Sequence, residues 1–170
     1  MSLAHCTLAK ECAFCVVAHA LSTEKQEVMG LLFGRWDGPQ AFIEEAHPLA
    51  RTDRRADRVE VKPEQLAKAA SIAESRGLRI VGWYHSHPRF VAQPSVTDIE
   101  NQRQYQTLFE DDAKDGPAPF VGLIVGTYDQ AATGPRSVFR YFHVAPPRDD
   151  VRAGDAVLPM ALRAQVRSYK

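Results

Sequence analysis

Hydrophobic and polar positions follow two different periods along this chain, and together they predict an α/β domain. Apolar side chains recur every three or four residues in three segments, which predicts helices over residues 9–22, from Pro63 to Gly77 and over 96–109. Short apolar or alternating runs predict strands at 28–33, 41–43, 59–61, 80–84, 120–125 and 138–144. We therefore expect a central mixed sheet of about six strands, flanked by helices.

The segments between these elements are predicted to be turns and loops. Asp37-Gly38-Pro39 marks a turn, and the mildly basic stretch Arg51–Arg58 is interpreted as a solvated loop. The acidic stretch Glu110–Pro119 is rich in helix breakers and is interpreted as a surface loop. No clear period follows residue 145. We predict one domain over residues 1–145 and a C-terminal extension over 146–170 whose structure the sequence does not define.

Size and charge narrow the classes of partner. A chain of 170 residues, 45% of them hydrophobic, suits one folded domain. Its 21 basic and 21 acidic residues balance, so neither nucleic acid nor an anionic membrane is expected as the main partner. No apolar stretch approaches the ~20 residues that span a bilayer. The first five residues lack the features of a secretory signal, so we expect a cytoplasmic or nuclear protein.

The cysteines are clustered near the start of the chain. Cys6, Cys12 and Cys15 are odd in number, which argues against a disulfide framework and fits a reducing compartment. The spacing of Cys12 and Cys15 is that of half a zinc site, but the chain has no second pair. We therefore interpret them as small buried hydrophobic residues.

Two histidines close the apolar strand at 80–84, and a carboxylate follows. Side chains two apart on a strand point to the same side, so His85 and His87 can face one point. Asp98, at the start of the next helix, would be a third ligand, leaving the open fourth position typical of catalytic zinc. Taken alone, His-x-His is also found as a hydrogen-bonded pair. Ser95 and Asp98 also fit a helix capping box, and this interpretation is compatible with a ligand role for Asp98.

The side chains around the histidines have simpler interpretations. Trp83 and Tyr84 are expected to be core residues, and strand alternation points Ser86 away from the metal. Arg89 and Phe90 follow the histidines in a loop where a substrate segment could pass.

The complete pattern, His-x-His-Pro, six residues and then Ser-x-x-Asp, resembles the signature of the JAMM (MPN-plus) metalloproteases. The resemblance covers about residues 8–145 and implies a cytidine-deaminase-like MPN domain with Zn²⁺ held by His85, His87 and Asp98. The family's upstream glutamate matches Glu27, which taken alone would be interpreted as a solvated surface residue. By this resemblance Glu27 is the general base and Ser95 donates to the oxyanion.

Three segments resemble one subfamily in particular, the catalytic subunit of the BRISC and BRCA-associated deubiquitinase complexes. These segments are residues 21–30, 57–66 and 81–88. This resemblance implies hydrolysis of isopeptide bonds in lysine-63-linked ubiquitin chains, with an MPN-minus scaffold subunit as partner. The sequence departs from the subfamily in a longer loop at 110–119. It also stops soon after the predicted domain, without the subfamily's long C-terminal helices.

Two alternatives stay open beside the zinc-dependent deubiquitinase. A JAMM hydrolase for another ubiquitin-like modifier, or for a small amide, would use the same metal chemistry. A non-catalytic MPN scaffold is disfavoured, because such members lose the ligand set that is intact here. Binding of nucleic acid through the arginine-rich loop has little support in a neutral chain.

Overall fold

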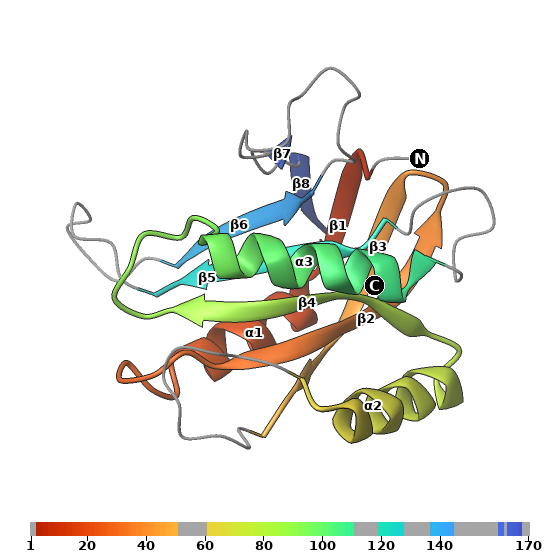
Figure 1. Cartoon of the computed structure of the whole chain (residues 1–170), viewed down its shortest axis with the longest axis horizontal. Coiled ribbons are helices and arrows are strands. Elements are labelled where there is room, and N and C mark those ends of the chain that lie inside the picture. Colours follow the sequence, from red (N-terminus) through yellow and green to blue (C-terminus); the bar gives the residue numbers. More distant parts are fainter. Residues whose placement is uncertain are drawn as a thin grey trace.

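One mixed sheet, with β4 and β2 at its centre, organises the chain (Figure 1). The computed structural model describes residues 3–50, 61–110, 119–127, 137–144, 160–161 and 163–167. The described strands are β1 (His5–Ala9), β2 (Met29–Asp37), β3 (Gln40–Pro48), β4 (Arg79–His87), β5 (Val121–Gly126), β6 (Val138–His143), β7 (Met160–Ala161) and β8 (Arg163–Arg167). The described helices are α1 (Lys10–Ala20), α2 (Pro63–Ser75) and α3 (Val96–Leu108). A mixed sheet with helices on its faces is an α/β fold, as predicted.

Strand order in the sheet is β7-β6-β5-β4-β2-β3-β1-β8. β4 runs parallel to β5 and antiparallel to β2, while β1 runs parallel to both β3 and β8. The remaining neighbours are antiparallel. The sheet is therefore mixed, and its central strand β4 carries the two histidines at its carboxyl end.

The two faces of the sheet are covered by different helices, with α3 and α1 on opposite faces (Figure 1). Tyr84 packs in one cluster with Cys12 and Val16 of α1. Its neighbour Trp83 packs in the other cluster, with residues of α2 and with Tyr105 of α3. Because both faces are buried, the central strands read as continuous apolar runs rather than as alternating ones.

The three predicted helices are confirmed, and so are five of the predicted strands, most of them longer than expected. α2 begins at Pro63 and stops before Gly77, whose φ of +69° is the left-handed conformation that ends many helices. The predicted strand at 59–61 is wrong at Val61, which lies in no strand, and residues 59–60 lie outside the described part.

Three strands were not predicted, so the described sheet has eight strands instead of about six. β1 precedes α1 directly, and its five residues are too few to show a period of their own. β7 and β8 belong to residues 146–170, yet they pair with β6 and β1 of the same sheet. The division into 1–145 and 146–170 stays a prediction.

The predicted loop at 51–58 lies outside the described residues, as does most of that at 110–119. None of the three described helices has both the length and the apolar character needed to cross a bilayer.

The cysteines take the structural role that was predicted. Cys6 and Cys12 are buried in the cluster under α1, Cys15 is partly buried, and all three are free thiols. Burial raises the pKa of Cys6 and of Cys12 to about 12.

Candidate metal site

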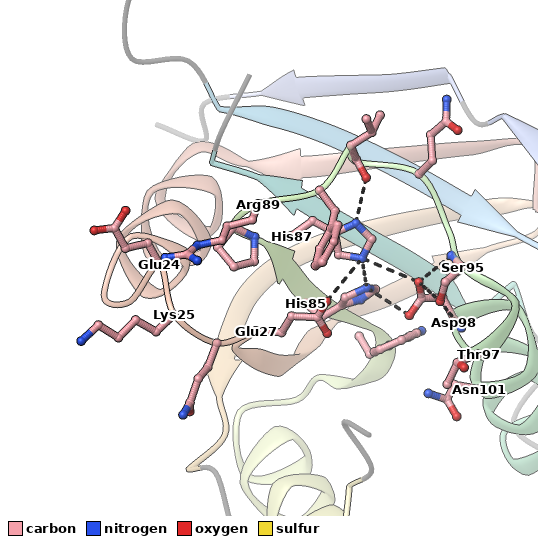
Figure 2. A pocket seen from close by; sticks show the side chains of 16 residues that line it. Glu24, Lys25, Glu27, His85, His87, Arg89, Ser95, Thr97, Asp98 and Asn101 are labelled. Atoms are coloured by element: carbon pink, nitrogen blue, oxygen red, sulfur yellow. Dashed lines mark hydrogen bonds and ion pairs between the residues drawn. The ribbon is translucent and has the colours of Figure 1, made fainter. Parts of the chain in front are cut away.

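The carboxyl end of β4 and the first turn of α3 bring three donor side chains together (Figure 2). The Nε2 atom of His85 lies 3.0 Å from Nε2 of His87 and 3.1 Å from Oδ1 of Asp98. Nε2 of His87 lies 3.7 Å from Oδ2 of Asp98. All three residues are buried, and they are the one group of at least three His, Cys, Asp or Glu residues within the described ranges that could hold a metal ion.

The start of α3 fixes the carboxylate of Asp98. Ser95 caps the helix with an extended backbone, and its hydroxyl accepts a hydrogen bond from the Asp98 N–H over 3.2 Å. In return Oδ2 of Asp98 accepts hydrogen bonds from the Ser95 N–H and the Ser95 hydroxyl, each over 2.7 Å. The predicted capping box is thus confirmed, and it leaves Oδ1 directed at His85.

The two imidazoles are held from their far sides. Nδ1 of His87 lies 2.9 Å from the backbone oxygen of Val91, which can only accept, so Nδ1 carries the hydrogen and Nε2 keeps its lone pair for the site. The ring of His85 stacks on Trp83, with centroids 4.8 Å apart and planes at 14°. Nδ1 of His85 is buried and has no hydrogen-bond partner among the described residues. Two imidazole Nε2 atoms and a carboxylate oxygen that converge in this way fit a divalent transition metal such as zinc.

The electrostatics of the three groups agree with a site for a cation. Burial alone would raise the pKa of Asp98, but hydrogen bonds to His85 and His87 outweigh burial and hold that pKa well below its usual range. Burial would lower the pKa of His87, but the bonds to Asp98 and Val91 and the charge of Glu27 raise it above its usual value. The negative charge of Asp98 thus favours a positive charge beside it.

Glu27 lies at the edge of this group, as its match to the family motif predicted. Its Oε1 is 3.9 Å from Nε2 of His87, and 26% of its side chain is exposed. Glu27 precedes β2, and Met29 pairs with His85 in the sheet. Ser86 points away from the histidines, as predicted, and its hydroxyl accepts a hydrogen bond from the Val28 N–H.

A pocket of about 670 Å³ opens over these residues. Its walls include all five predicted site residues, Glu27, His85, His87, Ser95 and Asp98. Arg89 and Phe90 also line it, and Phe90 is 67% exposed. The predicted substrate loop therefore borders the pocket.

Several pocket residues were not predicted. Lys25, Thr97 and Asn101 line the pocket, and Trp83, predicted only as a core residue, lines it as well. Asn101 stands three positions after Asp98, and this helical spacing was a signal available in the sequence. Lys25 carries no such signal, since it precedes β2 in a segment without a period.

The fold and the donor group together define an α/β domain with a histidine–histidine–aspartate cluster at the end of its central strand. The chain belongs to the JAB1/Mov34/MPN/PAD-1 ubiquitin protease family, whose model matches residues 1–111.

Curated relatives agree with this assignment. The chain is 43% identical over 118 residues to the Lys-63-specific deubiquitinase BRCC36 of Camponotus floridanus, and the aligned region covers 66% of this chain and 44% of that protein. It is 38% identical over 141 residues to human BRCC36, which carries the same description. That aligned region covers 65% of this chain and 42% of that protein. The chain therefore spans less than half the length of these relatives.

A solved structure has the same fold. The solution structure of a Desulfitobacterium hafniense protein matches with a TM-score of 0.69 at 22% identity, covering 96% of this chain and 94% of that one. At this identity the similarity concerns the fold alone.

Proposed function

We propose that this chain is a zinc-dependent deubiquitinase that hydrolyses isopeptide bonds in lysine-63-linked ubiquitin chains. The observation that carries the proposal is the buried group of His85, His87 and Asp98 with Glu27 at its edge. The curated relatives described as Lys-63-specific deubiquitinases support the choice of substrate.

Each donor has a defined part in holding the metal. His85 and His87 would bind zinc through Nε2, since Nδ1 of His87 is already bonded to Val91. Asp98 would bind through Oδ1, because Oδ2 is occupied by Ser95. When bound, zinc supplies two effects: it lowers the pKa of a coordinated water towards ~7, and it polarises the scissile carbonyl.

Glu27 moves the proton in this proposal. Its carboxylate lies beside the histidine ligands, so it accepts the proton of the attacking water at Oε1 or Oε2 and delivers it to the departing lysine amine. This step forms no covalent intermediate with the protein, and the buried thiols take no part in it.

Ser95 donates to the oxyanion that develops on the scissile carbonyl. In this structure its hydroxyl donates to Asp98 Oδ2. The backbone N–H of Ser95 donates to the same oxygen, so Asp98 keeps one bond from the cap when the hydroxyl turns to the substrate.

The rim of the pocket has the character of a binding surface for a chain segment. Phe90 and Val91 are 67% and 73% exposed although both are apolar. We propose that they contact ubiquitin, and that an MPN-minus scaffold subunit is the partner of this domain in the cytoplasm or nucleus.

Cleavage of linkage-defined diubiquitin tests the function. We expect the protein, with its scaffold subunit present, to cleave lysine-63-linked diubiquitin, to lose this activity with a zinc chelator and to regain it with added zinc. Preference for another linkage, or for another ubiquitin-like modifier, would contradict the proposed substrate. Cleavage that is insensitive to the chelator would contradict the metal mechanism.

A further inference from the structure

A buried glutamine, Gln102, lies on the inner face of α3, one turn after the proposed ligand Asp98. Gln102 has no exposed surface, and within α3 only Asp98 and Gln102 are buried. Its Oε1 accepts a hydrogen bond from the Trp83 indole N–H over 2.7 Å. Its Nε2 donates to the backbone oxygen of Phe120 over 2.8 Å and to Gln106 over 2.9 Å. A buried amide with this many partners is costly to replace, because its removal leaves polar groups without bonds.

Through Trp83, Gln102 is linked to the proposed ligand His85. The indole lies between Gln102, which holds its N–H, and His85, on which its ring stacks at 4.8 Å. Trp83 is itself only 1% exposed, so the indole has little freedom once the N–H is bonded. The plane of the indole therefore limits the rotation of the His85 ring.

Gln102 is also linked to the proposed ligand Asp98, because both residues belong to α3. Asp98 and Gln102 are four residues apart and lie on the same face of the helix. Because the Gln102 amide is bonded to β4 and to Phe120, just before β5, it fixes the rotation of α3 about its axis. That rotation decides where the carboxylate of Asp98 lies relative to His85.

A second glutamine extends this anchor. The Gln106 amide pairs with the backbone of Val144, donating to its oxygen over 2.8 Å and accepting from its N–H over 2.9 Å. α3 is thus bonded to β4, to the residue before β5 and to the residue after β6.

We infer that Gln102 is a positioning residue, which holds Trp83 and α3 so that His85 and Asp98 meet at one metal ion. The inference rests on the proposed function only in requiring that His85, His87 and Asp98 bind a metal. Gln102 touches neither metal nor substrate in this role. It acts through the indole and through the helix.

Gln102→Met tests the inference, because methionine keeps the length of the side chain and removes its hydrogen bonds. We expect zinc affinity, measured by competition with a chromophoric chelator, to fall on the order of 10-fold to 100-fold, the range seen when groups that orient metal ligands are changed. The absorption spectrum of the Co²⁺-loaded protein should also shift, since it reports ligand geometry. Gln104→Met, on the exposed side of the same helix, is the matched control and should leave both unchanged.

Trp83→Phe provides an independent arm and also serves if Gln102→Met does not fold. It keeps a ring against His85 and removes the N–H, so we expect the same direction of change in affinity and spectrum. In the double variant the fold-loss of zinc affinity should be smaller than the product of the two single fold-losses, because both substitutions remove the same Trp83–Gln102 hydrogen bond. Folded single variants with wild-type zinc affinity and Co²⁺ spectrum would overturn the inference, as would losses that multiply.

The metal measurements separate this inference from the proposed function. A wild-type protein that binds zinc but cleaves no diubiquitin would refute the proposed substrate, while the affinity and the spectrum would still decide the role of Gln102.

Discussion

The hydroxyl of Ser86 accepts a hydrogen bond from the backbone N–H of Val28 over 2.9 Å, and the Ser86 N–H donates to the Val28 oxygen over 2.9 Å. Ser86 stands between the two histidines in sequence, with its side chain on the other side of β4. Val28 directly follows Glu27. The residue between two proposed ligands therefore also holds the backbone that carries the proposed base.

Ser86→Ala should lower kcat by roughly 10-fold to 10²-fold while zinc affinity stays within about threefold. Loss of the hydroxyl releases the Val28 N–H, and a shift of ~1 Å at a catalytic group can cost ~10²-fold in rate. Diubiquitin turnover at equal zinc occupancy measures the effect. Ser86→Thr keeps the hydroxyl and is the control. A Ser86→Ala protein with wild-type kcat would show that Glu27 is positioned without this bond.

His87→Ala should remove most of the bound zinc. We expect about one zinc per chain in the unaltered protein, since the three donors form one site. The variant should lose it, because a site with three protein ligands has no spare ligand to replace His87. Metal analysis of dialysed protein measures the content, and Arg89→Ala, at the exposed rim, is the control. Unchanged zinc in His87→Ala would refute the proposed ligand set.

Glu27→Gln should separate metal binding from proton transfer. The amide keeps the shape of the side chain but cannot accept the proton, so activity should fall on the order of 10²-fold to 10⁴-fold with zinc content and melting temperature preserved. Turnover and metal content are measured on the same sample. Near-normal turnover would mean that another group is the base.

This chain alone should be a poor enzyme, and an MPN-minus partner should raise kcat more than it changes zinc affinity. The Glu27 side chain is 26% exposed, and the Phe90 and Val91 side chains beside the ligands are largely exposed. A subunit that restrains such groups can accelerate the reaction without adding a catalytic residue. Turnover with and without the partner, at equal zinc occupancy, is the measurement. Full activity from a verified monomer would contradict the prediction.

Stability should fall at alkaline pH because of the buried thiols. Burial raises the pKa of Cys6 and Cys12 from 9.0 to about 12, so the folded protein keeps both protons while the unfolded chain releases them. The free energy of unfolding is therefore unaffected by these two groups below pH ~9, and it falls as the pH rises from ~9 towards ~12. Chemical unfolding at pH 8 and pH 10.5 measures the decline.

The matched comparison is a double variant, Cys6→Ala with Cys12→Ala, which should lose less stability between these two pH values than the unaltered protein. An equal loss in both proteins would show that other groups cause the alkaline decline.

The amino-acid sequence by itself determined much of the site through local pattern. The shared side of His85 and His87 requires only an extended backbone, and the return of Asp98 towards Ser95 requires only the first turn of a helix. The helices and the central strands followed from apolar periodicity for the same reason, since each depends on neighbours within a few residues. The resemblance to the family motif then led to the prediction of Glu27, which no local pattern would have selected.

Only the tertiary structure decided which distant groups orient the site. Val28 and Ser86 are 58 positions apart, and Trp83 and Gln102 are 19 apart, so neither hydrogen bond leaves a periodic trace in the sequence. The same holds for β1, whose partner β8 lies near the other end of the chain. Pairings of this kind arise only when the sheet brings distant segments together, because a hydrogen bond depends on the distance between its atoms in space and not along the chain.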